Sequence, residues 1–278
     1  MSLTNFFKIN FNEHVVDVFF QDGNLFAILG KSVLRFPLGD KLSEYRNVIE
    51  VNSNIVDANL VGKRLTILTA DRSLFLLDNT TIKLELKNCI CNKICDFVNS
   101  GDDIYLLGDS VYALDIERKL AKQIFPLFEE KSGCVVVSAK DDASFILSDM
   151  WGFSVHDNRG DILFMKSFGE LITDLRVCKT ANDVYIFAVS KDGNVKIFKV
   201  DGEEVVNVEL GETVYSTYIK HSILNSFEIY WCSSKGVLNV SKIDLNGNLE
   251  TKTYQEIYCD KVKTFEYEGE EYIIILGR

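Results

Sequence analysis

The sequence predicts an all-β fold, a seven-bladed β-propeller, from three observations. Strand–turn–strand patterns recur along the whole chain, they recur with a constant period, and helical periodicity is nearly absent. The clearest hairpin covers residues 184–202. Its first half is rich in β-branched and aromatic residues, and its second half alternates apolar and polar residues, as strands do. Asp192 and Gly193 between the halves can adopt the positive φ angles of a tight turn.

Two independent markers define the period. The first is an aspartate between apolar residues early in a strand, and it occurs at Asp17, Asp57, Asp96 and Asp174, with spacings of 40, 39 and 78 residues. The second is the end of the second hairpin strand, near residues 36, 77, 114, 156, 198 and 241. Short strands repeated about every 40 residues indicate a propeller. A β-sandwich or a long meander is the alternative, but neither explains a constant period.

The repeat divides residues 1–278, read as a single domain, into seven units. Each of the first six has four predicted strands, and the third begins with an inner strand at 94–98. Residues 40–49 are also compatible with a short helix inserted in the first unit. The predicted blades cover residues 14–52, 54–88, 93–126, 133–169, 171–211, 213–256, and 261–278 together with 3–11.

The seventh unit contains only two predicted strands, at 262–267 and 272–276. Residues 3–11 alternate Phe7, Ile9 and Phe11 with polar residues, so we expect this segment to join the last blade as an outer strand and close the ring. The last blade would then have three strands. An incomplete blade can accept a strand from a partner protein through main-chain hydrogen bonds.

Composition narrows the class of protein. The net charge of −11 disfavours direct nucleic-acid binding, which depends on neutralising phosphates. Apolar runs of about six residues are too short to insert in a membrane, and the start of the sequence lacks the pattern of a secretory signal. An odd number of cysteines, seven, favours reduced thiols. These features predict a cytoplasmic or nuclear protein.

Degenerate motifs add a family resemblance. Asp78, Asp115 and Asp157 stand where WD40 repeats end a strand with Trp-Asp, and the four inner-strand aspartates match the frequent V-x-D/S-V pattern of that family. On these residues the chain resembles the WD40-like β-propeller superfamily over essentially its whole length. The Gly-His pair of good repeats is absent. The resemblance therefore implies blades held by apolar packing rather than by the family's His-Ser-Asp-Trp hydrogen-bond network.

Two sets of residues are candidate binding groups. The resemblance places Asp17, Asp57, Asp96 and Asp174 near the mouth of the central channel, where four carboxylates would attract a basic peptide or a cation. The alternative is that each aspartate accepts hydrogen bonds from neighbouring backbone amides. The second set is Met150 and Trp151 at a hairpin turn. Tryptophan is enriched at interface hot spots, so these two are predicted partner-binding residues, unless they pack on a neighbouring blade.

No catalytic, cofactor or metal site is predicted. Cys89, Cys91 and Cys95 lack a second pair of ligands downstream, so they are expected to be buried free thiols rather than zinc ligands. The other four cysteines are expected to be small apolar residues within or beside strands. The three histidines show no spacing typical of a metal site or a catalytic triad.

These observations favour a non-catalytic protein–protein interaction scaffold, a stable subunit of a larger intracellular complex without a cofactor. One alternative is a metal-dependent propeller hydrolase or lactonase that uses the inner aspartates. Another is an accessory subunit of an RNA-modifying complex, because residues 68–72, L-T-A-D-R, are similar to a stretch in the WD-repeat subunit of tRNA guanine-N7 methyltransferase. Fold by itself does not decide among them.

Overall fold

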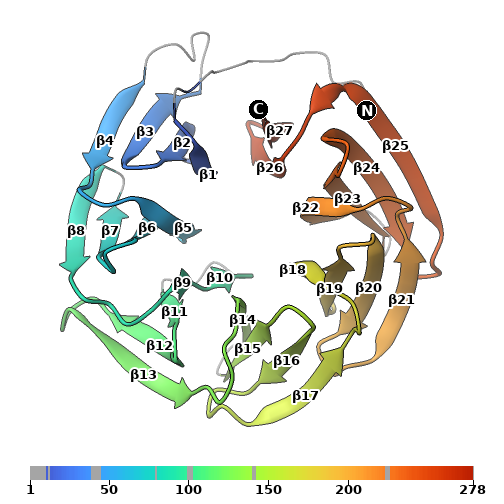
Figure 1. Cartoon of the computed structure of the whole chain (residues 1–278), viewed down its shortest axis with the longest axis horizontal. Helices are drawn as coiled ribbons and strands as arrows, with labels where there is room; N and C mark the ends of the chain where they lie inside the picture. The colour runs from blue at the N-terminus through green and yellow to red at the C-terminus, as the bar shows by residue number, and fades with distance from the viewer. Residues whose placement is uncertain are drawn as a thin grey trace. The chain divides into compact units, whose positions relative to one another are not determined.

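The computed structural model describes residues 11, 13–38, 45–78, 80–98, 103–139, 142–222 and 226–277. Contacts between Cα atoms divide the chain into two compact units. The first comprises residues 1–94, 101–108 and 112–123, and the second comprises 95–100, 109–111 and 124–278. Regular structure in the described ranges consists of strands (Figure 1). None of these ranges contains a helix long and apolar enough to cross a bilayer.

The first unit opens with two antiparallel sheets of four strands, each in chain order. Their strands are β1 (Val15–Gln21), β2 (Asn24–Leu29), β3 (Ser32–Pro37) and β4 (Arg46–Glu50), then β5 (Ile55–Val61), β6 (Arg64–Thr69), β7 (Leu74–Asp78) and β8 (Thr81–Leu86). The facing sides of the two sheets bury one apolar cluster that includes Ile28, Val33 and Ile67. The helix considered for 40–49 is wrong for its described end, because residues 46–49 pair with β3 as part of β4.

The third blade departs from the sequence prediction. Its sheet has the order β13-β12-β11-β9, built from β9 (Lys93–Ile94), β11 (Tyr105–Leu107), β12 (Ser110–Asp115) and β13 (Leu120–Pro126). The predicted inner strand 94–98 is divided. β9 pairs with β11, whereas β10 (Asp96–Phe97) pairs in parallel with β14 through Val135 and Val136. The division falls at Cys95, which forms a disulfide with Cys134 of β14.

The second unit contains three further blades of four strands, and β10 adds a fifth strand to the first of these sheets. The strands are β14 (Gly133–Ala139), β15 (Asp142–Ser148), β16 (Gly152–His156) and β17 (Ile162–Ser167); β18 (Ile172–Lys179), β19 (Val184–Ser190), β20 (Asn194–Lys199) and β21 (Glu204–Glu209); and β22 (Val214–His221), β23 (Ser226–Ser233), β24 (Val237–Asp244) and β25 (Leu249–Tyr258). Gly193 has a φ of 93°, as the predicted turn requires, and a side chain there would meet the carbonyl of Glu212.

The chain ends in a sheet of two strands, β26 (Lys261–Tyr267) and β27 (Glu270–Leu276). The described residues therefore form six full blades, and the prediction of seven is wrong. The repeat markers continue into a seventh unit, but a hairpin alone is half a blade. Of the segment 3–11 predicted to complete it, residues 3–10 lie outside the described ranges. Phe11 packs against Phe36 of β3, at a ring distance of 5.8 Å.

Candidate protein-interaction surface

The inner-strand aspartates of the first unit bind backbone amides. Asp17 and Asp57 each follow a β-bulge at the start of β1 and β5. Asp57 Oδ2 accepts a hydrogen bond of 2.7 Å from the backbone N–H of Ile94 on β9, the inner strand of the next blade. Asp17 Oδ1 accepts from the backbone N–H of Val18 at 2.6 Å. Asp57 therefore fastens one blade to the next.

The second unit repeats this arrangement and adds a cation. Asp174 follows the same bulge in β18, and its Oδ2 accepts from Thr217 of β22 through both the backbone N–H, at 3.0 Å, and the hydroxyl, at 2.9 Å. Arg176 lies 3.1 Å from Asp174 Oδ1 and 3.8 Å from a carboxylate oxygen of Asp96. The structure thus brings Asp96 and Asp174 to one guanidinium. The carboxylates of Asp17, Asp57 and Asp174 accept hydrogen bonds from backbone amides, as the alternative interpretation of these aspartates expects. Recruitment of a basic ligand by the four aspartates stays a prediction.

The Met150–Trp151 turn between β15 and β16 is held rigidly by its backbone. Asp149 Oδ1 accepts from the backbone N–H groups of Trp151, at 2.8 Å, and Gly152, at 2.9 Å. The carbonyls of Trp151 and Met150 accept from the N–H groups of Phe168 and Ile172, both at 2.9 Å. A side chain at position 152 would collide with the carbonyl of Lys166. Fixed in this way, Met150 and Trp151 remain 55% and 53% exposed.

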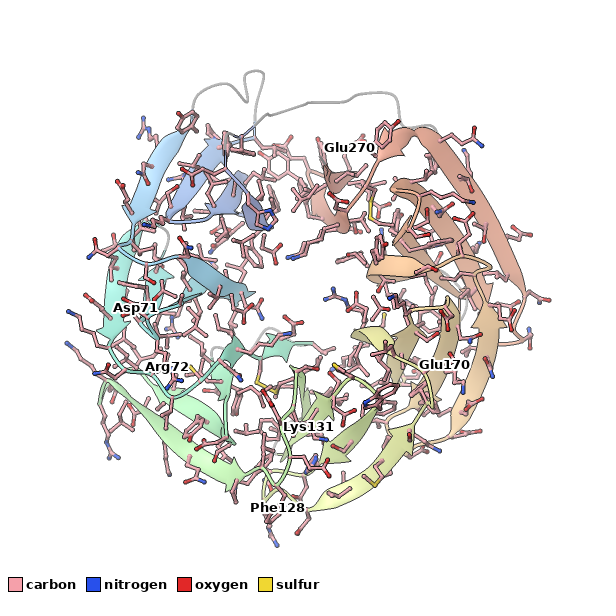
Figure 2. The ribbon with its side chains drawn as sticks, viewed as in Figure 1. Asp71, Arg72, Phe128, Lys131, Glu170 and Glu270 are labelled. Atoms are coloured by element: carbon pink, nitrogen blue, oxygen red, sulfur yellow. A yellow bond between two sulfur atoms is a disulfide. The ribbon has the colours of Figure 1, made fainter. Side chains whose placement is uncertain are left out.

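The loop between β13 and β14 lies beside this turn. Lys131 Nζ binds Asp149 Oδ2 at 2.9 Å and Glu129 at 3.4 Å, and the backbone N–H of Ser132 donates to the carbonyl of Ser148. Burial opposes ionisation of Asp149, but the hydrogen bonds from Lys131 and the two turn amides outweigh it and hold the pKa of that carboxyl below its usual range. Phe128 in the same loop is 99% exposed (Figure 2).

Exposed large apolar side chains concentrate on this blade. Of fourteen such residues in the described part of the chain, seven lie between residues 128 and 171. Single exposed apolar residues are ordinary on a protein surface, whereas a contiguous patch of them marks an interaction site. Within this set, Met150, Trp151 and Leu171 are neighbours, because Ile172 hydrogen-bonds to Met150. The seven are Phe128, Met150, Trp151, Ile162, Leu163, Met165 and Leu171.

Three of the seven lie on β17, the outer strand of the fourth blade. The other five outer strands, β4, β8, β13, β21 and β25, each expose at least one charged side chain and at most one large apolar residue. In β17, Ile162, Leu163 and Met165 are exposed, and its single charged residue, Lys166, is half-buried over the ring of Phe198. Edge strands are commonly protected by charge against pairing with other chains, and β17 lacks that protection.

The C-terminal hairpin is fastened to the sixth blade. Lys220 of β22 binds Glu266 and Glu271 at 3.2 and 3.0 Å, and a disulfide joins Cys232 of β23 to Cys259, which precedes β26. Among the described residues no strand pairs with the other edge of β27. The side chains from Tyr272 to Leu276 are half-buried. Within the described ranges the hairpin is thus fixed on the side of β26, and β27 forms the edge of its sheet.

The cysteines differ from the sequence prediction. Cys95 pairs with Cys134 and Cys232 with Cys259, so the expectation of free thiols is wrong for these four. The other three are free and buried, as expected. Pairing depends on which strands are neighbours in space, and the spacing of the cysteines along the chain does not show it. In the described ranges no group of three His, Cys, Asp or Glu side chains is arranged to hold a metal ion.

In the T-A-D-R stretch, residue 69 ends β6 and residues 70–72 begin the turn to β7, where Figure 2 labels Asp71 and Arg72. Thr69 and Asp71 line a polar recess of about 240 Å³. The polar side chains around this recess bind one another. Thr69 donates to Asp71, which lowers the pKa of that carboxyl, and Ser53 accepts from the backbone N–H of Asp71. Glu85 and Lys87 at its rim form an exposed ion pair. The side chains of Thr69 and Asp71, and those of Glu85 and Lys87, are therefore already paired with one another.

Sequence reasoning placed Met150 and Trp151 at a hairpin turn, where the structure has them exposed, and their role in partner binding stays a prediction. It did not single out the other exposed apolar residues. The signal available in the sequence was the unbroken run of four apolar residues from Ile162 to Met165, because the other outer strands contain at most two apolar residues in a row. Such a run is equally typical of a strand buried on both faces. The sequence reading had residues 162–167 as the fourth strand of the fourth unit, and the exposure of their apolar side chains became evident only in the structure.

Comparison with known proteins supports the fold. No family model and no curated protein sequence matches the chain. Among solved structures, the WD40 domain of Neurospora crassa Pan2 superposes with a TM-score of 0.67 at 14% identity, covering 90% of this chain and 82% of that one. BBS1N, solved in complex with ARL6DN, gives a TM-score of 0.69 at 9% identity, covering 91% and 85%. A chain of the Mitotic Checkpoint Complex gives 0.66 at 12% identity, covering 94% and 92%. The chain has a β-propeller fold similar to that of WD40 domains.

Proposed function

We propose that this chain is a non-catalytic scaffold, a stable subunit of an intracellular protein complex, and that it docks partners through its fourth blade. The observation that carries the proposal is the concentration of exposed apolar side chains between residues 128 and 171. The structural neighbours lend general support, since two of them were solved within protein complexes.

The surface has the properties of an interface hot spot. Trp151 and Met150 stand on a turn whose backbone is already hydrogen-bonded, so binding would cost little ordering of the chain. Burying a large apolar side chain contributes about 1.5–3 kcal/mol. Two or three of these residues in a partner's pocket would supply enough free energy for a specific complex.

The two-stranded C-terminal sheet supports a second mode of contact within the same function. The edge of β27, with which no strand of the described ranges pairs, can take a partner's strand through main-chain hydrogen bonds, while Lys220 and the Cys232–Cys259 disulfide keep the hairpin in place. A photo-crosslinking residue at Ile275 tests this contact. A crosslink to a partner protein supports it, and a crosslink to residues 1–11 of the same chain shows that the chain covers its own edge.

The experiment for the main proposal is affinity purification of the full chain from its own cells, followed by mass spectrometry. Trp151→Ser should lose a stoichiometric partner that the wild type retains. Ile82→Ser, at an equally exposed apolar residue of β8, is the matched control and should retain it. Retention of every partner by Trp151→Ser, or recovery of the wild type alone, would overturn the docking role of the fourth blade.

The same samples separate the two alternative functions. Recovery of a methyltransferase and RNA would favour the accessory subunit of an RNA-modifying complex. A lone chain with bound metal would favour the hydrolase, and would direct attention to the inner-strand aspartates despite their hydrogen bonds to Ile94 and Thr217.

A further inference from the structure

The Met150–Trp151 turn is an apolar site within an acidic surrounding. Leu171 lies beside the turn, because the backbone of Ile172 hydrogen-bonds to Met150, and it is 38% exposed. Glu129 and Glu130 come from the loop before β14, and Glu170 precedes Leu171. We call this set, Met150, Trp151 and Leu171 with Glu129, Glu130, Asp149 and Glu170, the Trp151 site.

The carboxylates of the site outnumber its cations. Lys131 is shared between Asp149 and Glu129, and only 9% of its side chain is exposed. Lys196 lies over the ring of Phe168, 5.0 Å from its centroid, and its charge helps to lower the pKa of Glu170. Against these two ammonium groups stand the four carboxylates of Glu129, Glu130, Asp149 and Glu170. Lys191 of the next hairpin donates its backbone N–H to the carbonyl of Leu171, but Asp192 follows it directly. The surface around Trp151 therefore carries a net negative charge.

Two of these carboxylates are held in the ionised state. The pKa of Asp149 is lowered by the hydrogen bonds described above, which outweigh its burial. Glu170 accepts from Asn194 Nδ2 at 2.9 Å, and hydrogen bonds from Asn194 and Ser190 lower the pKa of that carboxyl too. The negative charge at the site is thus fixed at neutral pH.

We propose that the Trp151 site binds a protein segment that carries a large apolar anchor flanked by lysine or arginine. This inference rests on the scaffold function proposed above and specifies the chemistry of the partner. Met150, Trp151 and Leu171 form the contact for the apolar anchor. The surrounding glutamates favour basic flanks, because complementary charge steers encounter and rejects acidic partners. Exposed Arg and Lys side chains also stack favourably on the indole face.

The acidic surround argues against two other occupants of the site. A second copy of this chain would bring an identical set of carboxylates and a net charge of −11 to a symmetric contact, and like charges across an interface are unfavourable. A polyanion such as RNA would meet the same repulsion. Both nevertheless appear as outcomes of the test.

The test is selection of a random dodecapeptide phage library on the immobilised full chain. The expected pool combines an aromatic or aliphatic residue with flanking Lys or Arg. A synthetic peptide with the consensus sequence should lose at least tenfold in affinity against Trp151→Ser and several-fold against Glu130→Lys, and should weaken between 50 and 500 mM salt. Ile82→Ser is the control and should bind the peptide unchanged, with circular dichroism confirming that each variant is folded.

Several results would overturn the proposal. They are a selected pool without excess basic residues, binding indifferent to Trp151→Ser, and no enrichment at all. Self-association of the chain that depends on Trp151, measured by light scattering, or Trp151-dependent retention of RNA would likewise assign the site to another occupant. If the purified complex still loses its partner on Trp151→Ser while the peptides are not basic, the scaffold function stands and only the partner chemistry is wrong.

Discussion

Replacing Asp174 by alanine should weaken the attachment between the fifth and sixth blades. The carboxylate accepts two hydrogen bonds from Thr217 and binds Arg176, and only 16% of its side chain is exposed. Alanine removes all three contacts. It leaves the backbone N–H of the buried Thr217 and the guanidinium of the half-buried Arg176 without this acceptor.

The magnitude follows from the contacts. A hydrogen bond to a charged group contributes about 1.5–3 kcal/mol, and bonds to one carboxylate do not add fully. We expect the free energy of unfolding to fall by about 3 kcal/mol for Asp174→Ala. Thr217→Val removes only the hydroxyl bond to this carboxylate and should cost about 1.5 kcal/mol. The double variant should cost less than the sum of the two, because both changes remove the same contact.

Urea unfolding monitored by circular dichroism measures these differences. With a denaturant slope of about 3 kcal/mol per molar, a loss of 3 kcal/mol lowers the midpoint by about 1 M. Asp192→Ala, an exposed aspartate at a turn, is the matched control and should leave the midpoint unchanged. An unchanged midpoint for Asp174→Ala would refute the structural role assigned here and would return the inner aspartates to consideration as ligand-binding groups.

Three further predictions concern the fourth blade and the cysteines. Phe164→Ala should lower the free energy of unfolding by about 2 kcal/mol because the Phe164 ring packs against Phe153. Met165→Lys, one residue along β17 and 64% exposed, should change it by at most about 0.5 kcal/mol in thermal unfolding. Equal effects of the two substitutions would contradict the burial pattern. The pKa of Asp149 is lower in the folded state than its unfolded value of about 3.9. The stabilisation that the ionised Asp149 contributes is therefore present above the unfolded pKa and is lost as the pH falls through the folded pKa. The difference in thermal stability between wild type and Asp149→Asn should vanish in acid, and a difference that does not depend on pH would contradict this. Alkylation of the denatured chain without reductant should modify three cysteines, and all seven after reduction; seven without reductant would show that the disulfides are absent.

The repeating strands could be predicted from the sequence because their signals are local. Alternation of apolar and polar residues, and turns such as Asp192–Gly193, depend on residues a few positions apart. The aspartate at the start of the inner strands is also a local signal, since it follows a bulge at the same place in β1, β5 and β18. The all-β propeller was therefore predictable from the sequence.

The role of those aspartates was only half predictable. Their positions suggested either backbone amides or a ligand as the bonding partner, and both are compatible with an aspartate at the start of a strand. The partners of Asp57 and Asp174 lie 37 and 43 residues further along the chain. Contacts of that separation depend on how neighbouring blades pack, which no periodic pattern specifies.

The sequence by itself determined the fold class, the repeat and the position of an apolar turn at Met150 and Trp151. Only the tertiary structure decided the number of full blades, the division of strand 94–98 at Cys95, the pairing of the cysteines and the exposure of β17. The physical reason is the same in each case. An apolar run or a cysteine has the same local preference wherever it lies, and its burial or partner is set by the strand that packs beside it.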